Sequence, residues 1–598
     1  MRLTDYHYIR TFRQNINTFA DKKVLMHRTE NNTWEGITWK EYATQADALS
    51  QALLSLGIGV QDKIGIFAQN MPKWTIADIA SLQIRAISVP IYATNTTEQA
   101  QYVINHAGIK VLFVGDQQQY DKAASIAGAC PSLTKIILMK DSIVPCESTF
   151  SLTWDALLAL GKEPKWNTLL QQRLQEAQLQ DLFTIIYTSG TTGDPKGVML
   201  DYENLAYQLV GHDERLDVDH TDVSLAFLPL SHVFERAWTY YILYKGVTNY
   251  YLENTTEIKA ALTEVRPTLM CAVPRFYEKV YATVYDMITG ASLVKKIVFS
   301  FATRSGKQML KAKQKGKKPS WFLAKAYALS DKLVFSKLKQ SLGGRIRFMP
   351  CGGANLEPSI GRFFHAIGVN VKLGYGMTET LATVSCWEDI PSKLKSVGGI
   401  MPNAEIKIGE NNEILVKGGM VMKGYYNNPE ETKNAFTHDG FLHTGDAGNL
   451  DAQNNVYITD RIKELMKTSN GKYIAPQHIE GKVGKDNVIE QIAVIADGRK
   501  FVAALIVPNF ETLGQMIKDL NISYKSPAEL IKNTQVIEFV SKRLHKFQKD
   551  LPDYEQIKKF TLLPKAFSID KNEITPTLKL KRKTIYQRYK KEIEAMYI

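Results

Sequence analysis

The chain has 598 residues, of which 44% are hydrophobic and 23% charged, and this composition excludes a disordered protein because it supplies enough apolar surface for several cores. Five scattered cysteines without a CxxC pair argue against a disulfide scaffold or a zinc knuckle and favour a reducing compartment. The formal net charge of +13 suits nucleic acid, an anionic membrane or phosphorylated substrates and does not choose among them.

Signals for export or for membrane insertion are missing from the sequence. The first residues, MRLTDYHY, contain no apolar core of a secretory signal, and no apolar run approaches the ~20 residues that span a bilayer. We therefore expect a cytoplasmic protein. Peripheral attachment to the cytoplasmic face of a membrane stays open.

Short β-rich runs alternate with helical patterns through the first two thirds of the chain. Buried strands are predicted at 63–68, 109–114, 135–139 and 183–187, and helices at 39–56 and 97–106. This alternation is typical of parallel sheets with helices on both faces, so we predict an α/β fold.

The sequence pattern changes near residue 460. A predicted strand at 455–459 is followed by Asp460-Arg-Ile-Lys-Glu, and the remaining residues carry their own strands at 491–496 and 501–508. We predict a large N-terminal domain over 1–459, with parallel or mixed sheets between helices. A smaller α+β domain is predicted over 460–598.

The net charge is concentrated in residues 295–347. This segment contains fifteen Lys or Arg against one acid, Asp331, so it carries +14 and the rest of the chain carries −1. We predict two helices joined by a solvated basic loop at 307–320. Four apolar residues then share one helical face: Leu323, Tyr327, Val334 and Leu338. Contact with an anionic membrane, and packing in a helix pair with a solvated basic face, are the two interpretations.

The strongest chemical pattern is YTSGTTGDPKGV at 187–198, directly after a predicted strand. Its glycines let backbone N–H groups approach an anion closely, while four hydroxyl side chains and Lys196 add donors. The spacing does not match the GxxxxGK[ST] of a Walker A loop. A surface turn is the alternative, but twelve ordered positions favour a phosphate cradle.

Six further motifs follow in order: LPLSHVFER at 228–236, GYGMTET at 374–380, GGMVMKGYYNNP at 418–429, HTGD at 443–446, DRIKELMKTSNGKYIAP at 460–476 and PTLKLKR at 576–582. Together with the loop at 187–198, they resemble, in the same order, the signatures of the AMP-forming adenylating enzymes. That superfamily includes acyl-CoA synthetases, luciferases and the adenylation domains of peptide synthetases. LSHVFER and the VPRFYEK at 273–279 resemble its long-chain fatty acyl-CoA synthetase subfamily.

The resemblance implies a nucleotide site. Tyr375, a flat ring between two glycines, suits stacking on adenine, Asp446 would accept both ribose hydroxyls, and Arg461 would bind the ribose and phosphates. Taken alone, these would be a structural tyrosine, a turn aspartate and a surface arginine. The residues implied to bind ATP or AMP are Thr188, Ser189, Gly190, Thr191, Thr192, Lys196, Gly353, Ala354, Gly374, Tyr375, Gly376, Thr378, Asp446 and Arg461.

The same resemblance implies the catalytic set, which comprises Lys579, Glu379, Thr188, Lys196 and His232. Glu379 is the implied carboxylate ligand of Mg²⁺. The superfamily usually has Ser-Gly-Lys at its C-terminal lysine, whereas this chain has Thr577-Leu-Lys579, a departure that resembles the long-chain subfamily. Lys581 and Lys583 are the neighbouring alternatives in register.

The resemblance also implies two reactions at one site. ATP activates a long-chain fatty acid to acyl-AMP, and coenzyme A, as co-substrate, then accepts the acyl group. Between them the mobile C-terminal domain is expected to rotate about Asp460, so that a loop with Lys467 and Gly471 faces the site. His232 and Trp238 are implied to line the fatty-acyl tunnel, with an aromatic gate.

Three other functions predict different observations. Another adenylate-forming enzyme, such as an acyl-AMP ligase or a luciferase-like oxygenase, would yield no acyl-CoA. A phosphotransferase or NTPase would release ADP, and the missing Walker A loop argues against it. A nucleic-acid binder would use residues 295–347, but the aromatic residues there follow an amphipathic helical pattern, so no nucleic-acid partner is expected.

Overall fold

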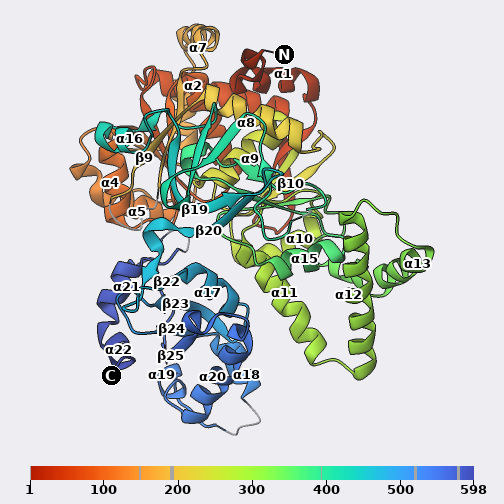
Figure 1. Ribbon diagram of the computed structural model, residues 1–598. Helices are drawn as coiled ribbons and strands as arrows, with labels where there is room; N and C mark the ends of the chain where they lie inside the picture. The colour runs from red at the N-terminus through yellow and green to blue at the C-terminus, as the bar shows by residue number, and fades with distance from the viewer. Residues whose placement is uncertain (1, 147–149, 189–193, 392, 518–521, 576–578) are drawn as a thin grey trace.

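The computed structural model describes residues 2–146, 150–188, 194–391, 393–517, 522–575 and 579–598. Figure 1 shows a large N-terminal part and, below it, a smaller C-terminal domain coloured blue. The predicted α/β class is confirmed, because parallel and mixed sheets with covering helices build the large part.

The first sheet has eight strands, and most of its neighbours run parallel. In spatial order they are β18 (Gly424–Tyr425), β9 (Gly197–Asp201), β8 (Leu182–Tyr187), β4 (Ile87–Ile91), β3 (Lys63–Phe67), β5 (Ile109–Val114), β6 (Lys135–Leu138) and β7 (Ser151–Thr153). The predicted strands at 63–68, 109–114, 135–139 and 183–187 are confirmed within one residue. Their near-continuous apolar runs reflect burial on both faces.

Three further sheets complete the N-terminal part. One contains, in order, β10 (Val223–Ala226), β11 (Thr248–Tyr251), β1 (Lys23–Arg28) and β2 (Trp34–Thr38); the next contains β12 (Met349–Cys351), β13 (Val371–Tyr375), β14 (Ser385–Cys386) and β15 (Gly399–Ile400). The third is antiparallel and contains β16 (Ala404–Ile408), β17 (Glu413–Gly418), β19 (Leu442–Leu450) and β20 (Val456–Arg461).

The C-terminal domain has its own sheets and cores. A hairpin pairs β21 (Met466–Lys467) with β22 (Tyr473–Ile474), and a second sheet contains β23 (Ile489–Ile495), β24 (Val502–Pro508) and β25 (Ile557–Leu562). Two hydrophobic clusters on either side of this second sheet draw on residues 466–597 alone. The strands predicted at 491–496 and 501–508 are confirmed.

Helices cover the sheets of the N-terminal part. They are α1 (Tyr8–Phe19), α2 (Trp39–Ser55), α3 (Pro72–Gln83), α4 (Thr97–Ala107), α5 (Gln117–Ile126), α6 (Trp154–Leu160), α7 (Pro164–Glu176), α8 (Tyr202–Arg215), α9 (Val233–Tyr244), α10 (Ile258–Val265), α15 (Pro358–Ala366) and α16 (Pro429–Asn434). The two predicted helices correspond to α2 and α4. A Thr38–Glu41 capping box starts α2, and Gly108, at φ 68°, ends α4 in the left-handed conformation.

The C-terminal domain adds six helices within its described residues. They are α17 (Pro476–Val483), α18 (Phe510–Met516), α19 (Pro527–Leu530), α20 (Thr534–Gln548), α21 (Arg582–Arg588) and α22 (Lys590–Ala595). Figure 1 places α21 and α22 on one side of the β23–β25 sheet and α17 and α20 on the other. This arrangement buries both faces of the sheet.

The basic segment forms a helical lobe that projects from the N-terminal part (Figure 1). The lobe begins with α11 (Pro274–Thr289), which precedes the basic segment. It continues with α12 (Leu293–Gln314), α13 (Trp321–Ser330), the π-helical turn η4 (Asp331–Phe335) and α14 (Ser336–Gln340). The prediction of a solvated loop at 307–320 is wrong for its first half. Met309 and Leu310 are buried and extend α12, so the connecting loop is confined to 315–320.

Three of the four residues of the apolar face predicted on this segment pack inward, and the fourth, Leu323, is partly exposed. Tyr327, Val334 and Leu338 are half-buried against the second hydrophobic core, and Tyr327 contacts the ring of Phe335 at 5.6 Å between centroids. These residues therefore belong to a packed helix pair. In the part of the chain that the structure describes, no helix combines the length and apolar content needed to cross a bilayer.

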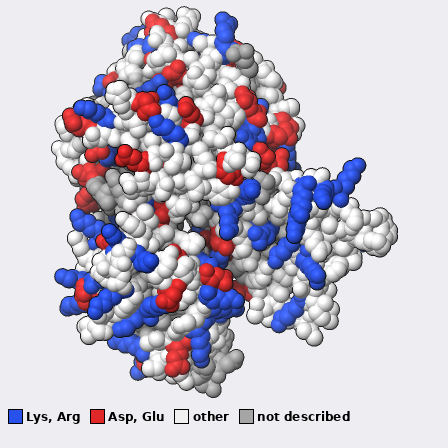
Figure 2. Space-filling view, viewed as in Figure 1, with Lys and Arg blue, Asp and Glu red and all other residues white. Residues whose placement is uncertain are grey.

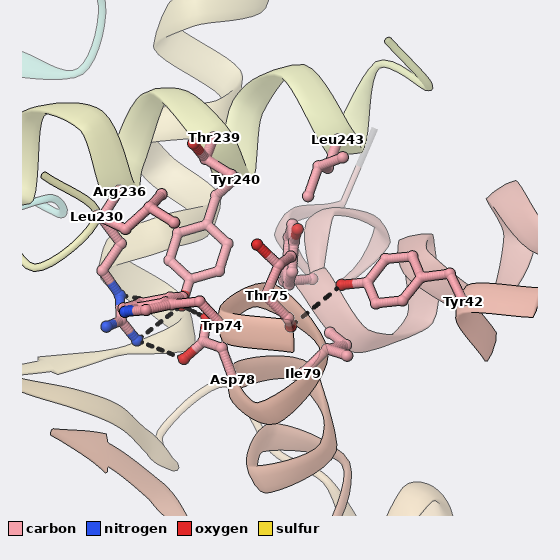
Figure 3. A pocket seen from close by; sticks show the side chains of 11 residues that line it. Tyr42, Trp74, Thr75, Asp78, Ile79, Leu230, Arg236, Thr239, Tyr240 and Leu243 are labelled. Carbon is pink, nitrogen blue, oxygen red and sulfur yellow. Dashed lines mark hydrogen bonds and ion pairs between the residues drawn. The ribbon is translucent and has the colours of Figure 1, made fainter. Parts of the chain in front are cut away.

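A buried ion pair lies in the core between α3 and α9 (Figure 3). An Arg236 guanidinium N–H donates to Asp78 at 2.7 Å, and the Tyr240 hydroxyl donates to the other carboxylate oxygen at 2.6 Å. Both charged side chains are less than 5% exposed. The adjoining cavity of about 10 Å³ has room for at most one water molecule, so it is a packing gap rather than a ligand site.

Removing one partner of this pair leaves a buried charge uncompensated. We expect Asp78→Ala to lower the unfolding free energy of the N-terminal part by about 3–5 kcal/mol, measured by denaturant unfolding. The control Glu253→Ala breaks an exposed pair with Lys140 and is expected to cost less than about 1 kcal/mol. Equal effects of the two substitutions would contradict the assignment.

Candidate active site

The centre of the candidate site is a carboxylate held by residues from three strands. Asp446 of β19 and Arg461 of β20 are cross-strand partners, with Arg461 Nε 3.2 Å from Asp446 Oδ1. The Tyr375 hydroxyl, at the end of β13, donates to Asp446 Oδ2 at 2.7 Å. Three motifs that are far apart in the sequence therefore meet at one point.

This point is largely closed to solvent. Asp446 is 5% exposed and Tyr375 is 8% exposed. Burial raises the pKa of the Asp446 carboxyl, and the charge of Arg461 and the Tyr375 hydrogen bond limit that rise. The carboxylate can accept further hydrogen bonds in a site of low dielectric, where they are stronger than in water.

A tight turn follows β13 and positions Glu379. A Cβ at Gly376 would lie 1.2 Å from the carbonyl oxygen of Ala382, so the backbones pass too closely for any side chain there. Leu381 and Ala382 take φ values of 47° and 82°, which are rare for non-glycine residues. The turn presents Thr378 half-buried and Glu379 8% exposed.

A tyrosine outside the predicted set contacts both Glu379 and Lys196. The Tyr425 hydroxyl donates to Glu379 Oε1 at 2.9 Å, and Lys196 Nζ lies 5.0 Å from the centre of the Tyr425 ring. Pairing of β18 with β9 places Tyr425 opposite Val198 and so beside the end of the phosphate loop. Burial raises the pKa of Glu379, and the Tyr425 hydrogen bond opposes the rise.

The ends of the predicted phosphate loop are held together. The Thr188 backbone N–H donates to the Lys196 carbonyl at 3.0 Å, where β8 leads into β9. Lys196 also forms an ion pair with Glu431 of α16. The other predicted loop residues, Ser189, Gly190, Thr191 and Thr192, lie outside the described residues.

Tyr425 and Glu431 are the contacts that sequence reasoning missed. Tyr425 lies inside the motif at 418–429. The two adjacent tyrosines of that motif were the sequence feature that could have indicated a functional contact. Glu431 lies two residues beyond that motif in an ordinary polar helix. Nothing in its own sequence context indicated a partner 235 residues away.

The two glycine-rich turns predicted beside the base are neighbours. Strands β12 and β13 run parallel, with Cys351 opposite Leu373. Gly353, at φ 86°, and Ala354 are exposed just beyond β12. A Cβ at Gly374 would lie 3.1 Å from the carbonyl oxygen of Ser385, so this turn also keeps two backbones close.

His232 and Trp238 lie at different depths on α9. His232 caps the helix, since its Nδ1 accepts the Phe234 backbone N–H at 3.2 Å. Desolvation and the charge of Lys579 lower its pKa to about 4, so the imidazole is neutral at physiological pH. Trp238 is 5% exposed in the core, where its indole N–H donates to Ser224 at 3.3 Å.

Lys579 brings the C-terminal domain into electrostatic range of the site. Lys579 as a whole is exposed at the domain surface. Its ammonium group, however, is desolvated where the two parts of the chain meet. Desolvation and Arg461 lower the pKa of Lys579, whereas Asp446, Glu464 and Glu379 oppose the shift. Lys581 instead donates to Asn572 within the C-terminal domain.

Asp460 is buried immediately before Arg461. Its Oδ1 accepts the Arg461 backbone N–H at 2.6 Å, and its Oδ2 has no hydrogen-bond partner among the described residues. Desolvation raises its pKa to about 7. The predicted CoA-facing loop is exposed at Lys467 and at Gly471, whose φ of 76° closes the turn.

Helix α11 and its neighbour α15 supply further contacts to the C-terminal domain. Arg275 donates to the Glu490 carbonyl at 3.0 Å, and Lys485 pairs with Glu357 at 2.6 Å. Near the other end of α11, Asn487 donates to Asp286 at 2.6 Å. The orientation of the small domain therefore depends on polar contacts, which can be exchanged more readily than a shared apolar core.

The side chains fit an Mg²⁺ ion that arrives with a nucleotide. Among the described residues, no three His, Cys, Asp or Glu side chains cluster closely enough to hold a metal by themselves. Glu379 is a buried carboxylate oriented by Tyr425. Mg²⁺ is commonly bound by one or two carboxylates together with substrate phosphates, which this arrangement suits.

Similarity to known proteins is extensive. Residues 12–426 match the AMP-binding enzyme family, and residues 463–598 match the AMP-binding enzyme C-terminal domain. A long-chain-fatty-acid–CoA ligase, FadD15, of Mycobacterium bovis is 32% identical over 585 residues, covering 96% of this chain and 94% of the relative. The peroxisomal long chain acyl-CoA synthetase 7 of Arabidopsis thaliana is 30% identical, covering 100% and 87%.

Solved structures share the fold at lower identity. The A domain of a carboxylic acid reductase from Segniliparus rugosus, in complex with AMP and a carboxylic acid, has a TM-score of 0.77 and 20% identity, covering 99% of this chain and 94% of that one. An o-succinylbenzoate CoA synthetase from Bacillus subtilis, with ATP and magnesium, has a TM-score of 0.65 and 19% identity, covering 96% and 98%. With both family matches and full-length relatives, this chain belongs to the AMP-binding enzymes.

Proposed function

We propose that the protein is an AMP-forming long-chain fatty acid–CoA ligase. A fatty carboxylate oxygen attacks the α-phosphorus of ATP and pyrophosphate leaves; the thiol sulfur of coenzyme A then attacks the acyl carbon, loses its proton and releases AMP. The observation that carries the proposal is the convergence of Asp446, Arg461, Glu379 and Lys579 from both parts of the chain. The names of the full-length relatives support the substrate class.

The nucleotide would lie across the ends of β13 and β8 and the middle of β19. In this proposal Tyr375 and the glycine turns at 352–354 and 374–376 flank the adenine, and Asp446 accepts the ribose hydroxyls. Arg461, already beside Asp446, reaches the ribose and phosphate. Thr188, Lys196 and the loop between them hold the phosphates, and Lys196 exchanges Glu431 for a phosphate oxygen.

Magnesium chemistry would be supplied at Glu379. A bound Mg²⁺ neutralises part of the phosphate charge, and Glu379 is its proposed protein ligand. Tyr425 fixes the rotamer of that carboxylate through its hydroxyl. Thr378 begins the same 3₁₀ turn and lies beside the phosphates in this arrangement.

Lys579 would supply positive charge where the two anions meet. A carboxylate and a triphosphate repel each other, so a cation near the developing negative charge is the largest help a protein can give. Lys579 is near enough to Asp446 and Glu379 for their charges to affect its pKa, which supports this role. Neutral His232 is near enough for the Lys579 charge to lower its pKa, and it suits the acyl end, where an imidazolium would attract water. Trp238 remains the proposed gate residue.

Thioester formation requires another arrangement of the same parts. We propose that the chain divides into domains 1–459 and 460–598 and that Asp460 is the hinge. Rotation would withdraw Lys579 and bring the loop with Lys467 and Gly471 toward the acyl-adenylate. The polar contacts of α11 and α15 would be exchanged in this step.

We also propose a cytoplasmic location with peripheral contact to an anionic membrane through 295–347. ATP and coenzyme A are water-soluble, whereas long-chain fatty acids partition into lipid. An enzyme that joins them benefits from reaching both phases. No nucleic-acid partner is proposed.

The test of function is a panel of free fatty acids of graded length, incubated with ATP, Mg²⁺ and coenzyme A. We expect acyl-CoA, AMP and pyrophosphate, with long chains preferred. ADP in place of AMP would indicate a phosphotransferase. Acyl-AMP that accumulates without acyl-CoA would instead indicate an acyl-AMP ligase.

Lys579→Ala should separate the two half-reactions. We expect adenylate formation, followed as pyrophosphate release, to fall by at least about 100-fold, because one transition-state contact is lost. Thioester formation from supplied acyl-AMP should be retained. Lys581→Ala and Lys583→Ala serve as controls with near-normal rates, and equal loss of both half-reactions in Lys579→Ala would rule out the assignment.

Tyr425→Phe should lower the apparent affinity of the enzyme for Mg²⁺. Without the hydroxyl, the Glu379 carboxylate loses its orienting donor and its pKa rises further. We expect the Mg²⁺ concentration for half-maximal rate to increase by about 10-fold or more. Tyr426→Phe, on the neighbouring residue, is the matched control, and an unchanged Mg²⁺ dependence in Tyr425→Phe would refute the role.

Asp460 should make the domain arrangement pH-dependent. Its pKa is raised from 3.8 to about 7 by desolvation; the charges of Glu464, Glu480 and Arg582 face it. A raised carboxyl pKa means that this arrangement binds the proton more tightly. Compared with an arrangement in which Asp460 has its ordinary pKa, it loses stability as pH rises from 3.8 to about 7, and the difference is constant above that. The ratio of adenylation to thioester rates should therefore fall as pH rises from about 4 to about 7 and level off above pH 7, and Asp460→Asn should flatten that profile.

A further inference from the structure

We propose that the outer faces of α12 and α13 form a docking surface that inserts apolar side chains into an anionic lipid bilayer. The inference rests on the membrane contact included above and names the residues that make it. They differ from the four residues of the predicted apolar face, three of which, Tyr327, Val334 and Leu338, pack against the core. The surface consists of two exposed apolar groups within the basic lobe.

The first group lies at the tip of the α11–α12 hairpin. Leu293, Ile297 and Phe301 follow at steps of four residues on one face of α12 and are 74%, 60% and 49% exposed. Val294, at 70%, and Met287 in the last turn of α11, at 60%, extend the group. Side chains of this size and number are uncommon together on a monomer surface unless they contact something.

The second group follows α13 and η4. Trp321 and Phe322 are 61% and 77% exposed, with ring centroids 4.9 Å apart, and Leu329 and Leu333 are about half exposed. Ser305 of α12 lies 2.8 Å from Ser330, oxygen to oxygen, so the two helices that carry the groups pack together. One rigid lobe therefore presents both groups.

Cations surround the apolar groups. Arg304 and Lys311 continue the face of Leu293 and Phe301 along α12, and both are exposed. Lys325 Nζ lies 3.9 Å from the centre of the Trp321 ring. None of these three cations has an ion-pair partner among the described residues. Figure 2 shows blue side chains standing among white ones over this lobe, at the lower right.

An anionic bilayer is the occupant that fits this chemistry. Long basic side chains reach lipid phosphates while their stems and the apolar groups enter the acyl boundary. A second copy of the lobe would bring two strongly basic surfaces together, which disfavours a symmetric dimer through this face. Leu, Ile, Val and Met outnumber the aromatic residues here, and aliphatic side chains do not stack on bases.

The test is flotation of the full-length protein with vesicles, independent of turnover. Wild type should float with phosphatidylcholine vesicles containing phosphatidylglycerol, and less with phosphatidylcholine alone. Binding should weaken at about 1 M salt, where the Debye length is about 3 Å. Ile297→Ser/Phe301→Ser and Trp321→Ser/Phe322→Ser should each reduce the partition coefficient at least about 10-fold.

Matched controls separate insertion from loss of folding or activity. Val144→Ser and Tyr554→Ser alter residues that are 72% and 45% exposed elsewhere, and they should float like wild type. All variants should keep the wild-type melting temperature and acyl-CoA formation without vesicles, so a failure of the proposed enzyme activity is seen separately. Flotation of the two double variants at wild-type level would overturn the proposal. Two other results would also overturn it. The first is that wild type does not float but sediments as a dimer, whereas the Trp321→Ser/Phe322→Ser variant sediments as a monomer. The second is that the protein binds RNA and does not bind vesicles.

Discussion

The arrangement of the whole protein depends on one buried carboxylate. Asp446 receives a hydrogen bond from Tyr375 and the charge of Arg461, so the ends of β13 and β20 are fixed to the middle of β19. Arg461 is also the last residue of the N-terminal sheets before the C-terminal domain begins its own. A buried carboxylate needs such partners, and here the same partners lie at the junction of the two parts, where we propose the nucleotide binds. Lys579 approaches this point from the C-terminal side.

Much of this organisation could be predicted from sequence because it is local. Continuous apolar runs such as 109–114 mark strands buried on both faces, and Thr38 with Glu41 marks a helix start. The site motifs were recognisable because glycine is required where backbones nearly touch, as at Gly376. Contacts between distant segments were not predictable in the same way. The contact of Tyr425 with Glu379 depends on the pairing of β18 with β9, which no local pattern indicates.

The basic lobe shows the same limit more sharply. Its helical spacing selected Leu323, Tyr327, Val334 and Leu338 as one face, of which the last three pack against the core. Periodicity does not tell whether a face meets protein or solvent. The π-helical turn at Asp331–Phe335 shifts the register between α13 and α14 and lets Phe335 enter the core. The exposed apolar residues then lie on the remaining sides. Only the packing of α12, α13 and α15 decides which side that is.

Helix α11 lies between two surfaces with different tasks. Arg275 and Asp286 contact the C-terminal domain, while the outer face of its hairpin partner α12 points away from that domain (Figure 1). Packed helices are about 8–10 Å apart, so α11 separates the small domain from the outer face of α12, where we propose lipid contact. In the proposed rotation the small domain would thus turn against protein, and the proposed membrane contact would leave the enzyme free to alternate between its two reactions while it stays bound to lipid.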